Sequence, residues 1–246
     1  GFSATTYIYT YDLAPGASIP TVTATAVASV ASASIKQASA IPGSTVVTVT
    51  AGDGSTQTYT VTFRVNYMAA WDGNGMGTTT DIPSNFGWKC SSDVTWVNAD
   101  NSNDTYAYRY RDNFGSGVGR VITHPVNNNV FSFPVSLTGG KVYNFTCRNS
   151  NVNGTCTTMF GINMSKDAMG RMLNSQSKTS AKWNSLSTFN FNFAAAVSGT
   201  YYMVWQTTNG TDRNIATDFL LTEVGNALNV SFNTDGGSEV ATQYFV

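Results

Sequence analysis

The chain is poor in charge and in the side chains that most metal sites require. Only 11% of its 246 residues are charged, the net charge is −1, and there is a single histidine, His124. The three cysteines, Cys90, Cys147 and Cys156, show no Cys-x-x-Cys spacing, which argues against a zinc or iron–sulfur cluster. Without an excess of basic residues, electrostatic binding of nucleic acid or of an anionic membrane surface is disfavoured.

The common catalytic arrangements are missing too. His124 is followed by proline and would have to serve alone in a Ser-His-Asp or Cys-His triad, and no nucleophile elbow occurs. A glycosidase needs two carboxyl groups across one cleft, whereas the only glutamates, Glu223 and Glu239, lie near the C-terminal end. Most aspartates occur in turn-like contexts. We expect a protein that is not an enzyme, with an Asp-based hydrolase as an alternative.

Long apolar runs are absent as well. No run approaches the ~20 residues of a membrane-spanning helix, and no charged-then-apolar leader opens the chain. We therefore expect no direct membrane insertion, and any export signal would lie upstream of Gly1. What the chain has in abundance is Thr, Ser, Asn, Gly and Val, together with 13% aromatic residues. This composition favours a folded, all-β protein long enough for two domains.

Alternation of side chains predicts a first small β domain over residues 1–67. Val46–Ala51 and Thr58–Val65 are expected to be strands, joined by a hairpin turn at Gly52-Asp-Gly-Ser55 whose glycines supply positive φ. Thr21–Thr25 also favours a strand over a helix. Tryptophans appear and the composition changes after Asn66, so the domain boundary is predicted at residues 66–68.

The second domain, residues 68–225, shows a series of strands with period 2. In Thr188–Phe193 three phenylalanines alternate with Asn190 and Asn192, which predicts one buried and one solvated face. The only helical pattern is Asp167–Leu173. The predicted strands are Tyr106–Arg111, Val130–Val135, Lys141–Cys147, Thr188–Phe193, Tyr201–Gln206 and Asp218–Val224.

Several stretches resemble known families. The ending AGDGSTQTYTVTF of the first domain resembles cadherin-like or immunoglobulin-like β-sandwich modules of bacterial surface proteins and polysaccharide-degrading enzymes. Phe131–Phe145, Gly199–Trp205 and Asp218–Glu223 resemble, in order, the jelly roll of galactose-binding-like and carbohydrate-binding modules. Leu228–Val240 resembles the start of the β-grasp repeat shared by Listeria internalins and Bacteroides surface proteins. These likenesses imply an immunoglobulin-like β-sandwich, a jelly-roll β-sandwich and, over residues 226–246, a truncated repeat or disordered tail.

Aromatic side chains crowd the loops of the second domain, beside Gly, Asp, Ser and Thr. A sugar site needs a flat ring flanked by amides, carboxylates or guanidinium groups, and this part of the sequence contains them. Alternation over Tyr106–Arg111 places the tyrosines on one face of the strand and the arginines on the other, and we expect the arginines to face outward. Trp88 and Trp205 are expected in the core. The predicted carbohydrate-binding residues are Trp71, Trp96, Arg109, Arg111, Asp112 and Trp183.

Two further features keep alternatives open. The jelly-roll resemblance implies a structural Ca²⁺, for which Asp72, Asn74 and Asp218 are candidate ligands, ordinary turn chemistry being the alternative. Cys147 and Cys156 flank a predicted hairpin loop, so both a disulfide and two buried thiols are compatible with the sequence.

The function expected from the sequence is binding rather than catalysis. We expect a carbohydrate-binding segment of a larger secreted or surface-anchored bacterial protein, monomeric, with polysaccharide as partner and no required cofactor. The alternative is a structural or adhesive spacer that contacts protein partners.

Overall fold

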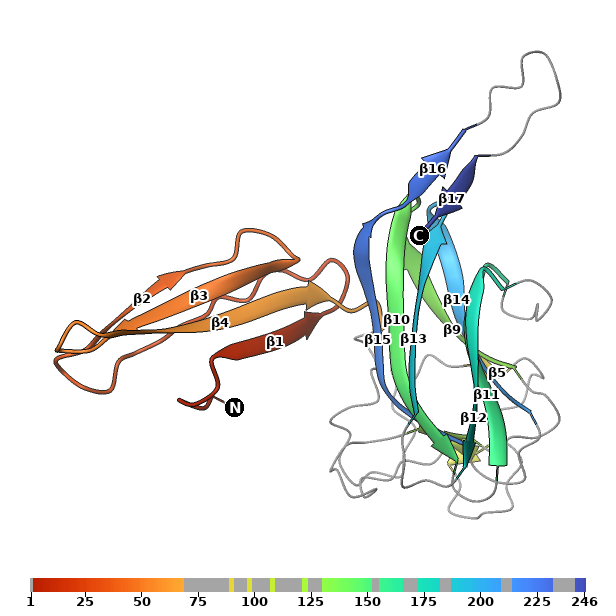
Figure 1. The fold of residues 1–246 in the computed structure, drawn as a ribbon, viewed down its shortest axis with the longest axis horizontal. Helices are drawn as coiled ribbons and strands as arrows, with labels where there is room; N and C mark the ends of the chain where they lie inside the picture. The colour runs from red at the N-terminus through yellow and green to blue at the C-terminus, as the bar shows by residue number, and fades with distance from the viewer. Residues whose placement is uncertain are drawn as a thin grey trace. The chain divides into compact units, whose positions relative to one another are not determined.

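The chain folds into two compact units, Gly1–Ala69 and Ala70–Val246, in this computed structural model. All regular structure among the described residues is β, as predicted (Figure 1). No helix among them is long and apolar enough to cross a membrane. The structure describes residues 2–68, 89–90, 97–98, 107–108, 121–123, 130–151, 155–165, 172–181, 187–208, 214–231 and 242–246.

The first unit is built on a single four-stranded sheet of order β1-β4-β3-β2, so residues 2–68 contain no second sheet to complete a sandwich. β1 runs parallel to β4 and the other neighbours are antiparallel. The likeness to immunoglobulin-like or cadherin-like modules stays a prediction. The strands are β1 (Ile8–Leu13), β2 (Ser32–Lys36), β3 (Gly43–Thr50) and β4 (Thr56–Val65).

The predicted hairpin of this unit is confirmed. Thr50 lies opposite Thr56 across the turn, and Gly54 has φ +83°, a conformation that glycine adopts without steric cost. The Asp53 carboxylate accepts hydrogen bonds from the Ser55 hydroxyl at 2.7 Å and the Ser55 N–H at 2.9 Å. These bonds stabilise the charged form and lower the pKa of Asp53.

The strand predicted at Thr21–Thr25 is wrong, because residues 21–26 form no ladder. The Gln37 amide takes the place of a partner strand there: its Nε2 donates to the Val22 carbonyl at 2.7 Å and its Oε1 accepts from the Val22 N–H at 3.2 Å. A side-chain amide can satisfy one residue in this way but cannot extend into a sheet. The edge strand of the sheet is formed instead by β2, which lies further along the Ala- and Ser-rich residues 22–40.

The second unit is a sandwich of two sheets that share one core. Sheet I has the order β13-β10-β15-β8 and sheet II the order β12-β11-β14-β9-β5, and the neighbours in both are antiparallel. From β8 to β15 the eight strands follow the connectivity of a jelly roll, as the resemblance implied. The strands are β5 (Lys89–Cys90), β8 (Val121–Thr123), β9 (Val130–Leu137), β10 (Lys141–Asn151), β11 (Thr155–Asn163), β12 (Asn174–Ala181), β13 (Ser187–Ala195), β14 (Gly199–Thr208) and β15 (Asn214–Asn226).

Two short strand pairs complete the described elements of this unit. β6 (Val97–Asn98) runs parallel to β7 (Ala107–Tyr108), and β16 (Leu228–Val230) pairs antiparallel with β17 (Gln243–Phe245). Five of the six predicted strands are confirmed within longer ones; of the sixth, Tyr106–Arg111, only residues 107–108 are described. Residues 167–171 of the predicted helix lie outside the described part.

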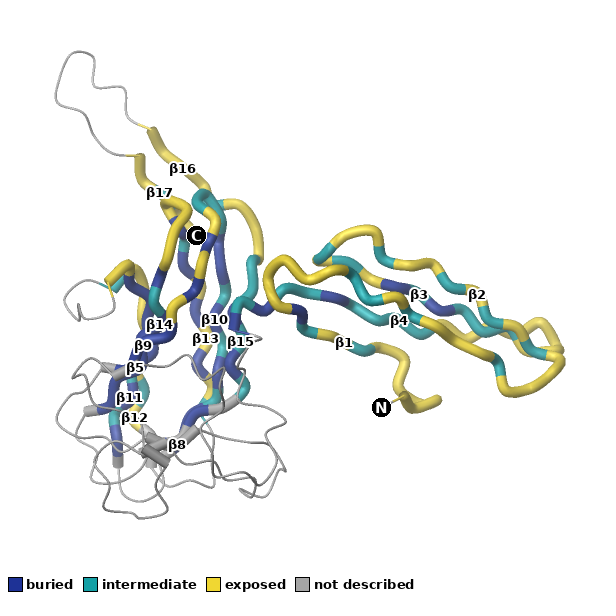
Figure 2. The backbone as a smooth tube through the Cα atoms, turned by 180° about the vertical axis from the view of Figure 1, so that it is seen from behind, coloured by how far each residue is buried: buried dark blue, intermediate teal, exposed yellow. Residues whose placement is uncertain are grey.

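Aromatic rings from both sheets fill the core. Phe160 of sheet II lies 4.9 Å from Phe189 and 6.1 Å from Phe219, both of sheet I, measured between ring centroids. Trp205 stacks on Phe160 at 5.5 Å and is fully buried, so its prediction as a core residue is confirmed. Dark blue, buried segments recur along strands of both sheets in Figure 2.

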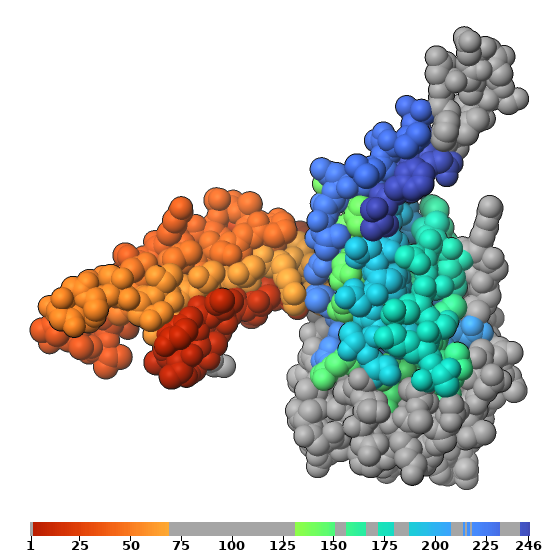
Figure 3. Space-filling model, viewed as in Figure 1, coloured from red at the N-terminus to blue at the C-terminus, as the bar shows by residue number. Residues whose placement is uncertain are grey.

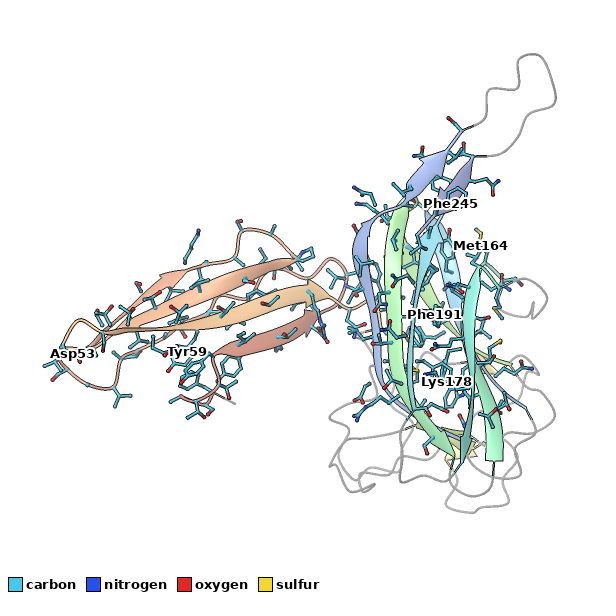
Figure 4. All side chains as sticks on the ribbon, viewed as in Figure 1. Asp53, Tyr59, Met164, Lys178, Phe191 and Phe245 are labelled. Atoms are coloured by element: carbon cyan, nitrogen blue, oxygen red, sulfur yellow. The ribbon has the colours of Figure 1, made fainter. Side chains whose placement is uncertain are left out.

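β13 shows the predicted division of its two faces. Phe189 and Phe193 are at most 1% exposed, Phe191 is 9% exposed and labelled between the sheets in Figure 4, and Asn190 and Asn192 are exposed. The outer edge of β13 is closed by side chains of β12 rather than by a strand. Asn174 donates to the Asn192 carbonyl at 2.5 Å, Gln176 accepts from the Asn190 N–H at 2.9 Å, and Lys178 donates to the Thr188 carbonyl.

The alternative of a disulfide is wrong: both Cys147 and Cys156 are free and buried. Residues 149–154 were expected to join two strands of one hairpin. The strands on either side of them are β10 of sheet I and β11 of sheet II. The two cysteines therefore stand on different sheets instead of facing each other across one ladder. Burial raises the pKa of both thiols.

Candidate functional site

The sequence-predicted sugar contacts cannot be placed from the described residues. Trp71, Trp96, Arg109, Arg111, Asp112 and Trp183 all lie outside that part, as do Asp72 and Asn74 of the calcium hypothesis. Only Asp218 is described. A candidate site has to be built from what the strands themselves present to solvent.

β15 carries an extra residue against β10 at two places, and the bulge between Thr146 and Arg148 sets the position of Asp218. The register shifts between Thr146 and Arg148, so Cys147 lies opposite both Asp218 and Phe219. Asp218 has φ +55°, a region in which aspartate is one of the few tolerated non-glycine residues.

The bulge also reverses the side-chain alternation of β15. Ala216, Phe219 and Leu221 are each at most 1% exposed, although strict alternation would send Ala216 and Phe219 to opposite faces. Because Asp218 is an extra residue, Ala216 and Phe219 can both face the core. Asp218 itself lies beside the outward face of sheet I. There its carboxylate pairs with Arg148, whose Nε donates to Oδ2.

Three asparagines form a cluster on the same outward face, which we name the amide cluster. Asn144 of β10 donates from Nδ2 to the Oδ1 atoms of Asn190 and Asn192 on β13, at 2.7 Å each. The Nδ2 groups of Asn190 and Asn192 make no hydrogen bond within the described part of the chain, and both residues are exposed. Register explains the grouping, because Asn144 lies directly opposite Asn192.

The amide cluster and the Arg148–Asp218 pair together form one surface, the polar face. Asn144 and Arg148 are four residues apart on β10, a separation of about 13 Å along the strand. Hydroxyls of Thr146, Thr188 and Thr222 share this face. The side chains of Arg148 and Asp218 are 38% and 27% exposed, so they neutralise each other while remaining within reach of a ligand.

The outward face of sheet II is less open. Val204 and Gln206 of β14 point away from the core, yet they are only 1% and 8% exposed. Tyr202 and Met159 are half-buried. The polar face of sheet I is therefore the more accessible of the two for recognition.

A buried hydrogen-bond network anchors the strands beneath one end of the polar face, and we name it the Asn214 hub. The Oδ1 atom of Asn214 accepts from Asn149 at 2.7 Å and from the Trp205 indole at 3.1 Å, while its Nδ2 donates to Thr158 at 2.9 Å and to the Ser150 carbonyl at 3.2 Å. Asn214 is fully buried. One side chain thus joins β10, β11, β14 and β15, which makes this end of the sandwich rigid.

The described residues contain no group of three or more His, Cys, Asp or Glu side chains able to hold a metal ion. The Asp218 carboxylate is engaged by Arg148, and a cation there would compete with the guanidinium. The possible calcium ligation by Asp218 with Asp72 and Asn74 stays a proposal.

The sequence contained a signal for part of the polar face. The alternation in Thr188–Phe193 predicts a solvated face that carries Asn190 and Asn192. It does not predict that these two amides bind a ligand. Arg148 and Asn144 were missed because their convergence with β13 and β15 depends on pairing between strands far apart in the sequence.

Known proteins of similar structure share little sequence with this chain. No family model and no curated protein matches the chain. Among solved structures, TmCBM61 in complex with β-1,4-galactotriose matches with a TM-score of 0.44 and 14% identity, covering 65% of this chain and 99% of that one. The CBM22-1 xylan-binding domain of Paenibacillus barcinonensis Xyn10C matches with a TM-score of 0.43 and 9% identity, covering 60% and 92%. The enzymatically active domain of bacteriophage CBA120 tailspike protein 4 matches with a TM-score of 0.42 and 9% identity, covering 65% of this chain and 22% of that one.

The matching structures thus include carbohydrate-binding modules and an enzymatically active domain.

Proposed function

We propose that the second unit is a non-catalytic module that binds an uncharged polysaccharide, within a larger bacterial protein that is secreted or attached to the cell surface. The observation that carries this proposal is the polar face: three amides and a neutralised Arg148–Asp218 pair, directed outward from one rigid sheet.

The chemistry of the polar face suits a polyhydroxylated ligand. Each sugar hydroxyl donates and accepts, and a side-chain amide offers both functions in one plane. The guanidinium and carboxylate form stronger, charge-assisted bonds, while their pairing leaves no net charge to repel or attract ions. Trp71, Trp96 and Trp183 would add ring contacts in this proposal.

Binding to insoluble and soluble neutral polysaccharides tests the proposal. We expect at least one of galactan, xylan, mannan and β-glucan to retard the 246-residue chain in affinity electrophoresis, and Arg148→Ala or Asn190→Ala to weaken binding about 10-fold. Ser177→Ala is the matched control, because Ser177 is exposed on the other sheet and should bind like wild type.

Failure of all polysaccharides would favour the alternative, a spacer that contacts protein partners. Release of reducing sugar by the pure chain would contradict the non-catalytic assignment. For calcium, a melting temperature that a chelator leaves unchanged would remove the ion from the proposal.

A further inference from the structure

The first unit exposes a row of aromatic rings, which we name the tyrosine track. Tyr9 and Tyr11 alternate along β1, and Tyr7 directly precedes it in extended backbone whose carbonyl accepts from the Thr60 N–H of β4. The three side chains share one face, where Tyr59 of β4 and Phe2 join them. Ring centroids lie 5.4 Å apart for Phe2 and Tyr59 and 5.7 Å apart for Tyr7 and Tyr59. Tyr59, which Figure 4 labels, contacts the rings of both Phe2 and Tyr7.

The track is unusually exposed for so large an aromatic surface. Phe2 is 74%, Tyr11 57% and Tyr7 47% exposed. In Figure 3 the first residues of the chain, in dark red, project from the surface of the first unit. Contiguous exposed apolar surface in a folded domain commonly marks an interaction site.

Hydrogen bonds hold the rings in place. The Tyr9 hydroxyl donates to the Ser3 carbonyl and accepts from the Ser3 N–H, both at 2.8 Å, and the Tyr59 hydroxyl donates to the Ala4 carbonyl at 3.1 Å. Phe2 precedes this fixed turn and stacks on Tyr9 with an interplanar angle of 27°. A platform ordered before binding loses little entropy when a ligand arrives.

The charge of the surface indicates the kind of ligand. The charged residues of these two strands, Asp12 and Arg64, lie on the opposite face of β1 and β4 and pair with each other at 2.5 Å. The hydroxyls of Tyr7 and Tyr11 make no hydrogen bond within the described residues. Rings with free hydroxyls and no ionic group fit an uncharged ligand that alternates apolar faces with hydroxyls.

We propose that the tyrosine track is a second glycan-binding site, which stacks an extended, uncharged saccharide chain along β1. Tyr7 and Tyr11 lie four residues apart, about 13 Å along an extended strand, which is longer than one sugar ring. This inference rests on the proposed function, because it takes the same class of ligand.

Substitutions in the full chain test the track. Tyr7→Ala and Tyr11→Ala are each expected to weaken binding of the polysaccharide about 3- to 10-fold, the loss of one stacking contact, while Tyr11→Phe keeps the ring and most of the affinity. Ile8→Ala is the matched control: Ile8 is 72% exposed but on the opposite face of the same strand, and it should leave binding unchanged. Circular dichroism checks that each variant folds.

The outcomes separate this inference from the proposed function. If the track variants bind like wild type while Arg148→Ala is weakened, the track is overturned and the polar face stands. If only the track variants are weakened, the track stands and the polar face is wrong. If wild type binds no neutral polysaccharide, or if a proline-rich peptide occupies the track instead, the inference is overturned.

Discussion

At the scale of single residues, Asn214 links strands of both sheets in the second unit. It is a buried amide whose hydrogen bonds reach Asn149, Ser150, Thr158 and Trp205. A buried polar group that loses its hydrogen-bond partners destabilises the folded state, whereas a fully bonded one fixes the positions of the strands around it.

We expect Asn214→Ala to lower the free energy of unfolding by about 3 kcal/mol, since it removes the partner of several buried groups at once. Urea unfolding followed by tryptophan fluorescence measures this. Asn192→Ala serves as control, because that exposed amide accepts one described side-chain hydrogen bond, and its loss should cost under about 1 kcal/mol. Equal losses for the two variants would contradict a central role for Asn214.

Asp53 gives a residue-scale prediction for pH. Its pKa in the folded chain is lowered, first by the Ser55 hydroxyl and then by the Ser55 N–H. Any stability from these bonds is therefore present above the unfolded pKa and is lost as pH falls through the lower, folded pKa. We expect Ser55→Ala to move the Asp53 midpoint in a carboxyl NMR titration upward, toward 3.8; an unmoved midpoint would rule out the hydroxyl as the main cause.

At the scale of elements, the bulge of β15 at Asp218 decides which side chains face the core. Its left-handed residue is Asp218, with φ +55°. Asp218→Gly and Asp218→Ala both remove the ion pair with Arg148, but only alanine adds backbone strain at positive φ.

We therefore expect Asp218→Ala to be about 1 kcal/mol less stable than Asp218→Gly, as measured by urea unfolding. The comparison cancels the lost ion pair. Equal stability of the two variants would show that the bulge moves to another residue or that the strand relaxes.

Period-2 alternation predicts side-chain direction correctly in some of the strands and wrongly in others. Phe189, Phe191 and Phe193 point inward as their spacing indicates, because side-chain direction in a strand is a local property. The same rule fails for β15, where Ala216 and Phe219 are both buried, since the bulge between them arises from pairing with β10. Likewise Thr21–Thr25 has the pattern of a strand, but within the described residues a side chain, that of Gln37, bonds the Val22 backbone in place of a neighbouring strand.

At the scale of the whole molecule, the two units differ greatly in core size. In residues 2–68 the buried apolar side chains are Leu13, Val47, Phe63 and Met68, and most of the first unit is teal or yellow in Figure 2. The second unit buries a continuous set of aromatic rings. Small cores yield marginal stability.

We expect the first unit to unfold at a lower urea concentration than the second. All five tryptophans follow residue 70, so tryptophan fluorescence reports the second unit alone, while hydrogen exchange of β3 and β4 amides reports the first. A common midpoint for both probes would show that the units unfold as one cooperative body.

The sequence by itself determined the all-β class, the hairpin at Gly52–Ser55 and the two faces of β13, because composition, turn chemistry and period-2 alternation are properties of neighbouring residues. Its single histidine and the spacing of its cysteines also predict neither a metal cluster nor a catalytic triad. Only the tertiary structure decided that Cys147 and Cys156 stand on different sheets, that Asp218 meets Arg148, and that Asn144 meets two asparagines of β13. Those outcomes depend on which distant strands pair and in which register, and a local sequence pattern does not specify long-range pairing.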